Sequence, residues 1–441
     1  MQFTSTRNNN LTVSFSQAVR DCIPDDGGVF VPSTIEDMRR WIYYIDETTP
    51  FASIAGSLTS ALMHEEFSPI ICETIATAAF PVEPVVKQLD GSLFMTEMYH
   101  GFTGCHRDYG VSYLVSYLET TLQLKGGKAV FVDFTHGGLG ALLSKILKGK
   151  KNIKAVLVYK KGTVRGLDED SLAWNGGNIY PVEMEGSEAE IKAAISEVFA
   201  DREFVQTNGL TVANTTNVCR LLGQIFFFPY SFAQVKNKFN GELYYAMGAG
   251  NYGSLIAGLY SWRFALPVNG FYVPSTAALA RSANGAPVVL DSIVELEKRG
   301  ETNPAIPANL ERLESFFGKN EMMMRNFIYP CDVSEAQRDA AAKELYMKYG
   351  IFADKDTASA YAVVKENCSE VYDEDGAFIL TAYNHPSLSS DYCRHVIGEA
   401  PEMPENIKEA QQPVQLGRPV ITSVEELKRI AGSLFNAANP S

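Results

Sequence analysis

Short apolar runs that alternate with helical stretches constrain the fold of this chain more than any other feature. Runs rich in β-branched and aromatic residues predict strands at 129–134, 155–159, 178–184, 242–247 and 378–382. The stretches between and after them predict helices at 111–124, 140–147, 188–199, 217–234, 255–265, 334–349, 357–366 and 423–434. The acidic, proline-containing stretch 399–413 is typical of a surface connection. This alternation predicts an α/β protein with parallel sheets covered by helices.

The composition indicates a globular protein. With 441 residues, 46% of them hydrophobic, the chain is long enough for two or three domains with sizeable cores. No apolar run has the length of a membrane span and no secretory signal is visible, so we expect a cytoplasmic protein without a membrane partner. The formal charge of -14 argues against a nucleic-acid partner. The seven cysteines form no CxxC pair, which favours reduced thiols.

A glycine-rich loop follows the expected strand at 242–247. It reads Gly248-Ala249-Gly250-Asn251-Tyr252-Gly253, and the next helix begins near Ser254. Glycines let the backbone approach a phosphate closely, and the N–H groups of the following helix point toward the charge. The loop therefore predicts a phosphate cradle. The alternative is a tight turn that needs glycine only for packing.

Segments along most of the chain match, in order, the motifs of one enzyme family. They are 5–7 (STR), 13–19 (VSFSQAV), 26–32 (DGGVFVP), 97–110 (EMYHGFTGCHRDYG), 159–164 (YKKGTV), 214–222 (NTTNVCRLL), 249–254 (AGNYGS), 356–358 (DTA) and 381–386 (TAYNHP). These segments resemble the threonine synthases, lyases of threonine biosynthesis that use pyridoxal phosphate to convert O-phosphohomoserine to threonine and phosphate. The last motif departs from the family, because Tyr383 and Asn384 interrupt it.

The resemblance implies a fold and a division into domains. The fold is the tryptophan synthase β-like one (fold type II): two open parallel-sheet α/β domains that face a cleft, with an N-terminal mainly helical region. The expected parts are residues 1–95, a smaller α/β domain at 96–225 and a larger α/β domain at 226–441. The altered lysine segment belongs to the smaller domain, and the glycine loop belongs to the larger one.

Arg107 stands where the family has the lysine that carries pyridoxal phosphate as a Schiff base. The matches on both sides of it leave no room for a register shift. A Schiff base needs an amine that can lose its proton, which a tuned lysine can do. The guanidinium of arginine stays protonated in proteins. We therefore expect pyridoxal phosphate as the family cofactor, without covalent attachment, and we expect Arg107 to project into the cleft as a fixed positive charge.

The resemblance also assigns candidate binding residues. For the cofactor they are Gly248, Gly250, Asn251, Gly253 and Thr381, the threonine facing the pyridine nitrogen. For the substrate they are Thr135, His136, Gly137, Asn214, Asn217 and Arg220. Simpler interpretations remain open: Thr381 as a turn residue, Asn217 as a helix N-cap, and Arg220 on a solvated helix face.

The substrate loop at 135–141 has lost much of the family's polar pattern. The family reads approximately T-S-G-D-T-G-S, whereas this chain has His136, Gly138 and Leu139 at three of its polar positions. The hydrogen bonds of those side chains are therefore missing, although a backbone nest can persist. Three of the six histidines, His100, His106 and His136, fall in the two altered segments. Their spacing matches no established ligand motif, so we expect no metal site.

Two function classes remain after this reasoning. The first is a threonine synthase-like protein that keeps phosphate-ligand binding but lacks normal pyridoxal phosphate catalysis, which makes it a pseudoenzyme candidate whose partner is a phosphorylated small molecule. The second is an active threonine synthase or related lyase in which another group, such as a lysine from elsewhere in the chain, replaces the missing one. The sequence favours the first.

Overall fold

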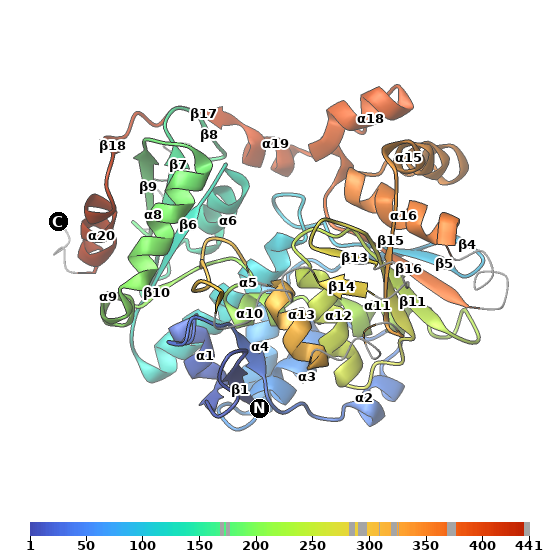
Figure 1. The fold of residues 1–441 in the computed structure, drawn as a ribbon, viewed down its shortest axis with the longest axis horizontal. Helices are drawn as coiled ribbons and strands as arrows, with labels where there is room; N and C mark the ends of the chain where they lie inside the picture. Colours follow the sequence, from blue (N-terminus) through green and yellow to red (C-terminus); the bar gives the residue numbers. More distant parts are fainter. Residues whose placement is uncertain are drawn as a thin grey trace.

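The computed structural model describes residues 1–167, 172, 177–281, 287–289, 298–307, 309–318, 324, 326–367 and 376–435. Its elements form two lobes, each built on a mainly parallel sheet, with the N-terminal elements along the lower side of the molecule (Figure 1). In the part of the chain described, no helix has both the length and the apolar character needed to cross a membrane.

The smaller lobe is built on five strands. They are β6 (Ala129–Phe134), β7 (Ile153–Lys160), β9 (Ile179–Met184), β10 (Leu210–Thr211) and β18 (Val420–Ile421). The sheet order is β10-β6-β7-β9-β18, and every pair is parallel. The centre of β7, at 155–158, has no exposed surface, as expected for a strand covered on both faces. The helices of this lobe are α6 (Gly138–Ile146), α8 (Glu188–Ala200), α9 (Arg202–Asn208) and α20 (Val424–Ser433).

The larger lobe is built on six strands. They are β4 (Val85–Asp90), β5 (Leu93–Glu97), β11 (Leu243–Ala246), β12 (Gly270–Pro274), β15 (Ile328–Cys331) and β16 (Ala377–Ala382). Their order is β15-β12-β11-β16-β5-β4, parallel except for the edge strand β4. Its helices are α11 (Phe227–Val235), α12 (Gly253–Arg263), α13 (Asn309–Phe317), α15 (Glu335–Tyr349), α16 (Lys355–Asn367) and α18 (Ser390–Ile397).

The N-terminal region combines a small sheet with helices. Strands β1 (Gln2–Ser5), β2 (Val13–Ser14) and β3 (Phe30–Pro32) form the antiparallel sheet β2-β1-β3. The helices are α1 (Phe15–Asp21), α2 (Arg39–Tyr44), α3 (Phe51–Met63) and α4 (Pro69–Ala79). This region is therefore mainly helical, as expected, with a small antiparallel sheet beside the helices, and β4 and β5 join the sheet of the larger lobe.

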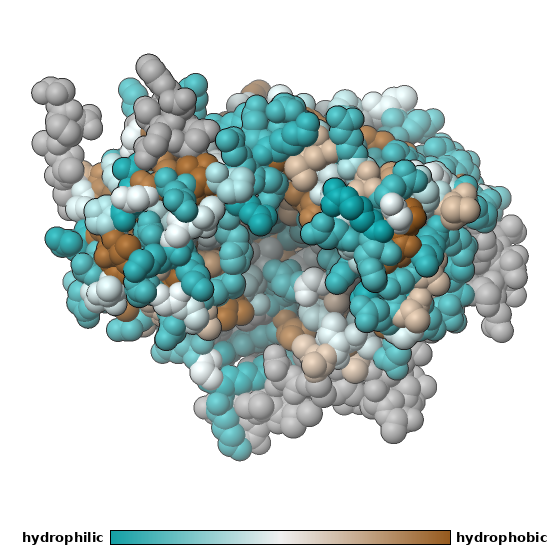
Figure 2. Space-filling view, turned by 90° about the horizontal axis from the view of Figure 1, so that it is seen from above, coloured by the Kyte–Doolittle hydropathy of each residue, from teal (hydrophilic) through white to brown (hydrophobic). Residues whose placement is uncertain are grey.

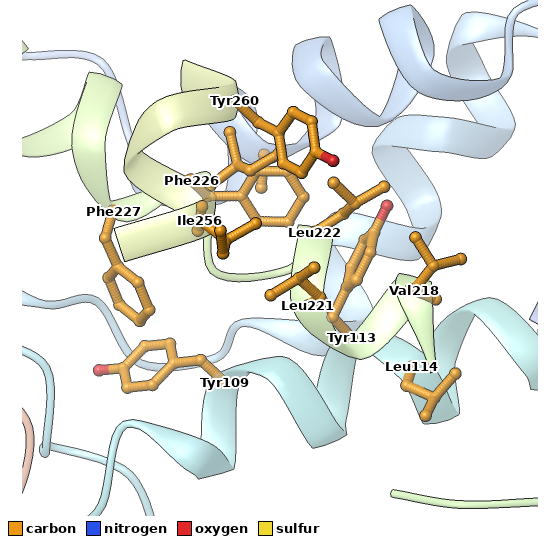
Figure 3. Packing of buried hydrophobic residues seen from close by; sticks show 14 of the residues in the cluster. Tyr109, Tyr113, Leu114, Val218, Leu221, Leu222, Phe226, Phe227, Ile256 and Tyr260 are labelled. Atoms are coloured by element: carbon orange, nitrogen blue, oxygen red, sulfur yellow. The ribbon is translucent and has the colours of Figure 1, made fainter. Parts of the chain in front are cut away.

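A buried aromatic cluster fixes the helix that carries Arg107. This helix, α5, spans Arg107–Lys125. Tyr109 packs edge-on against Phe227 at 5.1 Å between ring centroids, and Tyr113 packs against Phe226 at 4.9 Å. Figure 3 shows these rings meeting between α5 and the segment that connects α10 (Val218–Leu222) to α11. Edge-to-face packing of this kind holds the first turn of α5 in place.

Most expected strands and helices are present, with two informative differences. The single helix expected at 217–234 is divided into α10 and α11, because α10 ends at Gly223, its C-cap. The expected connection at 399–413 contains α19 (Glu405–Gln411), which is stabilised by burial of Ile407 and Ala410. The described cysteines form no disulfide with one another, and Cys368 lies outside the described residues. The domain boundaries at 95 and 225 stay a prediction.

Candidate functional site

A cavity of about 570 Å³ is lined by residues from both lobes. Seen from above, the surface shows a recess between the lobes (Figure 2). The residues singled out from the sequence that line the cavity are Arg107, Thr135, His136, Asn214, Arg220, Gly250, Asn251 and Gly253. Gly137, Gly248, Asn217 and Thr381 are described by the structure but lie outside this lining. The fold thus brings together residues that are up to 146 positions apart in the chain, from Arg107 to Gly253.

The glycine loop leaves an open space at the start of α12. Gly250 has a φ of 47° and Tyr252 a φ of 60°, so the chain turns tightly before the helix begins at Gly253. A Cβ at Gly250 meets no atom within 4 Å. The first N–H groups of α12 have no partner within the helix and lie at its positive end. This arrangement suits an anion such as phosphate.

Two buried side chains that the sequence did not reveal support this loop. Asn309 donates from Nδ2 to Thr215 Oγ1 (2.9 Å) and to the backbone oxygen of Asn251 (3.0 Å). Arg312 is fully buried and donates to the backbone oxygens of Thr215 (2.6 Å) and Thr216 (2.9 Å). No sequence motif marks Asn309 or Arg312. Both bond to Thr215, more than 90 positions away along the chain, so a local sequence pattern cannot show these contacts.

Arg107 lines the opposite wall of the cavity, at the first residue of α5. Gly138 is the first residue of α6, and a Cβ added there would lie 2.6 Å from Arg107 NH2. The guanidinium therefore occupies the space that any side chain at position 138 needs. Arg107 Nε is buried and has no hydrogen-bond partner among the described residues. The two altered positions fit each other sterically.

Arg220 lines the same cavity as Arg107. Its side chain is buried at 4% exposure and packs directly against Gly110 of α5. Nε and NH1 have no hydrogen-bond partner within the described part of the chain. Burial, together with the nearby Arg107, lowers the pKa of Arg220 to about 10, so it stays charged at pH 7. The nearby Asp108 carboxylate is already occupied by the N–H and hydroxyl of Thr103.

Asn217 and Asn214 have different roles. Asn217 is the N-cap of α10, where its Oδ1 accepts from Cys219 N (3.0 Å). Its Nδ2 donates to the Val19 backbone oxygen and to Thr211 Oγ1, so the amide is fully used by the protein. The structure therefore corrects the assignment of Asn217 to the substrate and favours the helix-cap interpretation. Asn214 lines the cavity and also donates to a backbone oxygen at 2.8 Å.

The residue assigned to the pyridine nitrogen is buried behind the cavity wall. Thr381 is the last residue but one of β16, and it is 3% exposed. Tyr383, two residues later, lines the cavity and donates from its hydroxyl to the Gly248 backbone oxygen (3.3 Å). The Tyr383 ring lies 4.8 Å from the ring of His106. Burial, with the neighbouring arginines, lowers the pKa of His106 to about 3, so its imidazole is neutral at pH 7.

The substrate loop is held by its own threonine. Thr135 Oγ1 accepts from Gly137 N (2.9 Å) and from Gly140 N (3.3 Å). His136 is 75% exposed, and its Nε2 lies 3.0 Å from Glu188 Oε2. The role of Thr135 in this geometry is therefore to shape the turn, while the assignment of Thr135 and His136 to a ligand stays a prediction.

The histidines of the altered segments do not converge. His100 contacts Glu97 (3.0 Å), His106 packs against Tyr383, and His136 contacts a glutamate at the cavity edge. Cys105 Sγ lies 3.7 Å from His106 Nδ1, and burial raises the pKa of its thiol. Among the residues that the structure describes, no three histidine, cysteine or acidic side chains are placed to hold a metal ion.

One lysine does reach the cavity from elsewhere in the chain. Lys192, on α8, is the lysine among the described lining residues. Its Nζ lies 2.6 Å from Glu188 Oε1, one helix turn earlier, and 5.5 Å from the centroid of the Phe134 ring. The sequence predicts a helix at this position but cannot show which face is turned toward the cleft, because that depends on the sheet order.

Comparisons with known proteins agree with this architecture. Residues 2–80 match the family model "Threonine synthase N terminus". The threonine synthase of Escherichia coli is 26% identical over 93% of this chain and 94% of its own length, and that of Haemophilus influenzae is 25% identical over 91% and 92%. The crystal structure of the Escherichia coli enzyme has a TM-score of 0.76 at 21% identity, covering 98% of this chain and 99% of that one. A pyridoxal phosphate-bound threonine synthase from Brucella melitensis has a TM-score of 0.79 at 17% identity, covering 99% and 100%.

The fold and the cleft between its two sheets define the class: an α/β protein with the architecture of fold type II pyridoxal phosphate enzymes. Within that class, the N-terminal match and the similarity along the whole length make this chain threonine synthase-like.

Proposed function

We propose that this protein binds a phosphorylated small molecule in the cleft, without covalent attachment, and that it lacks the normal lysine-dependent catalysis of threonine synthases. The observation that carries the proposal is the contrast between an open, well-supported glycine loop and an arginine at the lysine position. A backbone cradle attracts phosphate without any titratable side chain, so loss of the lysine leaves that attraction in place.

The residues present fit pyridoxal phosphate at its phosphate but not at its aldehyde. The open space at Gly250 fits the phosphate, whereas Thr381, which the resemblance assigns to the ring nitrogen, is buried and lies outside the cavity lining. When bound, this cofactor supplies an electron sink for reactions of amino acids. In this chain Gly250, Asn251 and Gly253 would hold it, while Arg107 offers only a fixed charge. General acid–base groups contribute roughly 10²–10⁴-fold, and that factor is missing with the lysine.

Calorimetric titration with pyridoxal phosphate, O-phosphohomoserine and inorganic phosphate tests the binding. We expect at least one of them to bind and Gly250→Asp, which puts a carboxylate into the cradle, to abolish that binding. The matched control is Gly149→Asp: Gly149 also has a positive φ (77°) and open space around it, but it does not line the cavity. If none of the three ligands binds, or if both variants behave alike, the loop is only a structural turn.

The second candidate is an enzyme in which Lys192 replaces the missing lysine, and it rests on the presence of Lys192 in the cavity lining. Its Nζ is held in an ion pair with Glu188 (2.6 Å), which would have to break before the amine could attack an aldehyde. Borohydride reduction with pyridoxal phosphate, followed by peptide mapping, decides between the two. We expect no specific adduct. A stoichiometric adduct on Lys192 that Lys192→Arg removes would establish the second candidate instead.

A further inference from the structure

Two arginines in the cleft have guanidinium nitrogens without an acceptor among the described residues. These nitrogens are Arg107 Nε and Arg220 Nε and NH1, all of them buried. Both side chains line the same cavity, and Arg220 is only 4% exposed. The Asp108 carboxylate lies near both arginines, but it accepts from the N–H and the hydroxyl of Thr103. Buried donors without an acceptor are costly, so this pair of arginines calls for a further anion.

The start of α6 adds to the positive potential at this point. Arg107 NH2 reaches the position of a Cβ on Gly138, the first residue of that helix. Thr135 Oγ1 satisfies the N–H groups of Gly137 and Gly140, which leaves the other N–H groups of the first turn without a side-chain cap. A cation at a helix N-terminus is unfavourable unless an anion lies between them.

We infer that Arg107 and Arg220 form a second anion site, so that the ligand of this cleft carries an anionic group in addition to the phosphate held at Gly250. A carboxylate or a second phosphate fits the planar donors of two guanidinium groups. The site depends on Arg107 and on the absence of a side chain at Gly138. It replaces recognition by the polar side chains that the loop at 135–141 lacks. This inference rests on the proposed function, because it adds a second contact to the same ligand.

Two commercially available phosphate esters form a matched pair of probes. Glycerol 3-phosphate and 3-phosphoglycerate share a phosphate on a three-carbon chain. At the other end of the chain, glycerol 3-phosphate has a hydroxymethyl group where 3-phosphoglycerate has a carboxylate. We expect the wild-type protein to bind 3-phosphoglycerate about tenfold or more tightly than glycerol 3-phosphate, the range of one charge-assisted hydrogen-bonded pair. Calorimetry at fixed ionic strength measures both affinities.

Two variants separate the position of the guanidinium from its charge. Arg107→Met removes the charge, and Gly138→Ala keeps it but displaces the guanidinium, because the new Cβ lies 2.6 Å from NH2. In both variants we expect the preference for 3-phosphoglycerate to fall to about threefold or less. Binding of glycerol 3-phosphate should weaken less than binding of 3-phosphoglycerate. The control is Arg165→Met. Arg165 is a cation in the lining of the same cavity, and its NH1 already donates to Gln411 (3.1 Å). This control should keep the preference.

The outcomes distinguish this inference from the proposed function. Equal affinities of the wild-type protein for the two esters, or a preference that survives Arg107→Met, overturn the second anion site and leave the phosphate cradle in place. Binding of neither ester overturns both. A melting temperature for each variant shows whether a lost preference reflects the site or the fold.

Discussion

The two walls of the cleft differ in how their polar groups are satisfied. On the larger lobe, the glycine loop is supported by a network in which Asn309 and Arg312 use their donors on backbone oxygens. On the opposite wall, Arg107 and Arg220 have nitrogens without partners among the described residues. A phosphate cradle depends on backbone geometry and tolerates changes of side chain, whereas lysine chemistry depends on one amine. The function we propose, binding without lysine-dependent catalysis, corresponds to this difference between the two walls.

The largest expected effect is on the free energy of unfolding, and it compares one arginine from each wall. Arg312→Met leaves the buried backbone oxygens of Thr215 and Thr216 without their donor, together with Asn309 Oδ1. We expect it to lower the free energy of unfolding by about 3 kcal/mol or more. Arg107→Met removes a side chain whose Nε has no hydrogen-bond partner among the described residues, and it should change stability by about 0.5 kcal/mol or less. Urea denaturation followed by circular dichroism measures both.

Equal losses in the two variants would contradict the comparison, because Arg107 would then be as integral to the fold as Arg312. Arg39→Met is the control for removing a surface charge, since that side chain is 77% exposed and its ion pair with Asp37 spans 3.5 Å. Such exposed pairs contribute little to stability.

The sequence predicted elements more reliably than contacts. Apolar runs with glycine-rich ends located β6, β7, β9, β11 and β16, because local pattern determines strands of this kind. The sequence pattern did not reveal the division between α10 and α11. Gly223 ends α10 within an apolar stretch that predicts one continuous helix. Helix periodicity alone does not reveal such a break.

The candidate site was predictable only where a motif marks it. The glycine loop, Arg107 and Arg220 were found from motifs, and the structure places Arg107, Arg220 and residues 249–253 of the loop at the cavity. Asn309, Arg312 and Lys192 were not found, since their importance arises from contacts across the fold. Gly138 was noted as a lost side chain, but its steric match with Arg107 could not be read from the sequence.

A smaller effect concerns two buried carboxyls, one on each wall. Burial raises the pKa of Asp133, at the end of β6, to about 7, and burial with the nearby Asp354 raises that of Asp356, in α16, to about 6. A raised pKa means that the folded state holds a proton that the unfolded state has released. Stability therefore falls as the pH rises from about 4 to about 7 through Asp133, and from about 4 to about 6 through Asp356.

Substitution by asparagine removes that titration. Asp133 Oδ2 accepts from Ala213 N at 2.8 Å, and an asparagine carbonyl can keep this bond. We expect Asp133→Asn to stabilise the protein by about 1–3 kcal/mol more at pH 8 than at pH 5. For Asp356→Asn the same difference should be smaller, because its pKa is less raised. Urea unfolding at the two pH values provides the measurement, and a pH-independent effect of Asp133→Asn would show that its carboxyl is ionised throughout.

The smallest expected effect is the most informative about the altered wall: restoring the lysine alone should not restore catalysis. Arg107→Lys returns an amine to the family position, but the loop at 135–141 still lacks the polar side chains at His136, Gly138 and Leu139. The positive charge of the nearby Arg220 would also favour the neutral form of an amine at position 107. We therefore expect this variant to gain a borohydride-reducible adduct with pyridoxal phosphate while threonine formation from O-phosphohomoserine stays at the wild-type level. Parallel adduct mapping and a threonine assay separate attachment from turnover. A gain of about 100-fold or more in turnover from this single change would show that the lysine was the only missing part, and that the rest of the altered wall is still competent for the reaction.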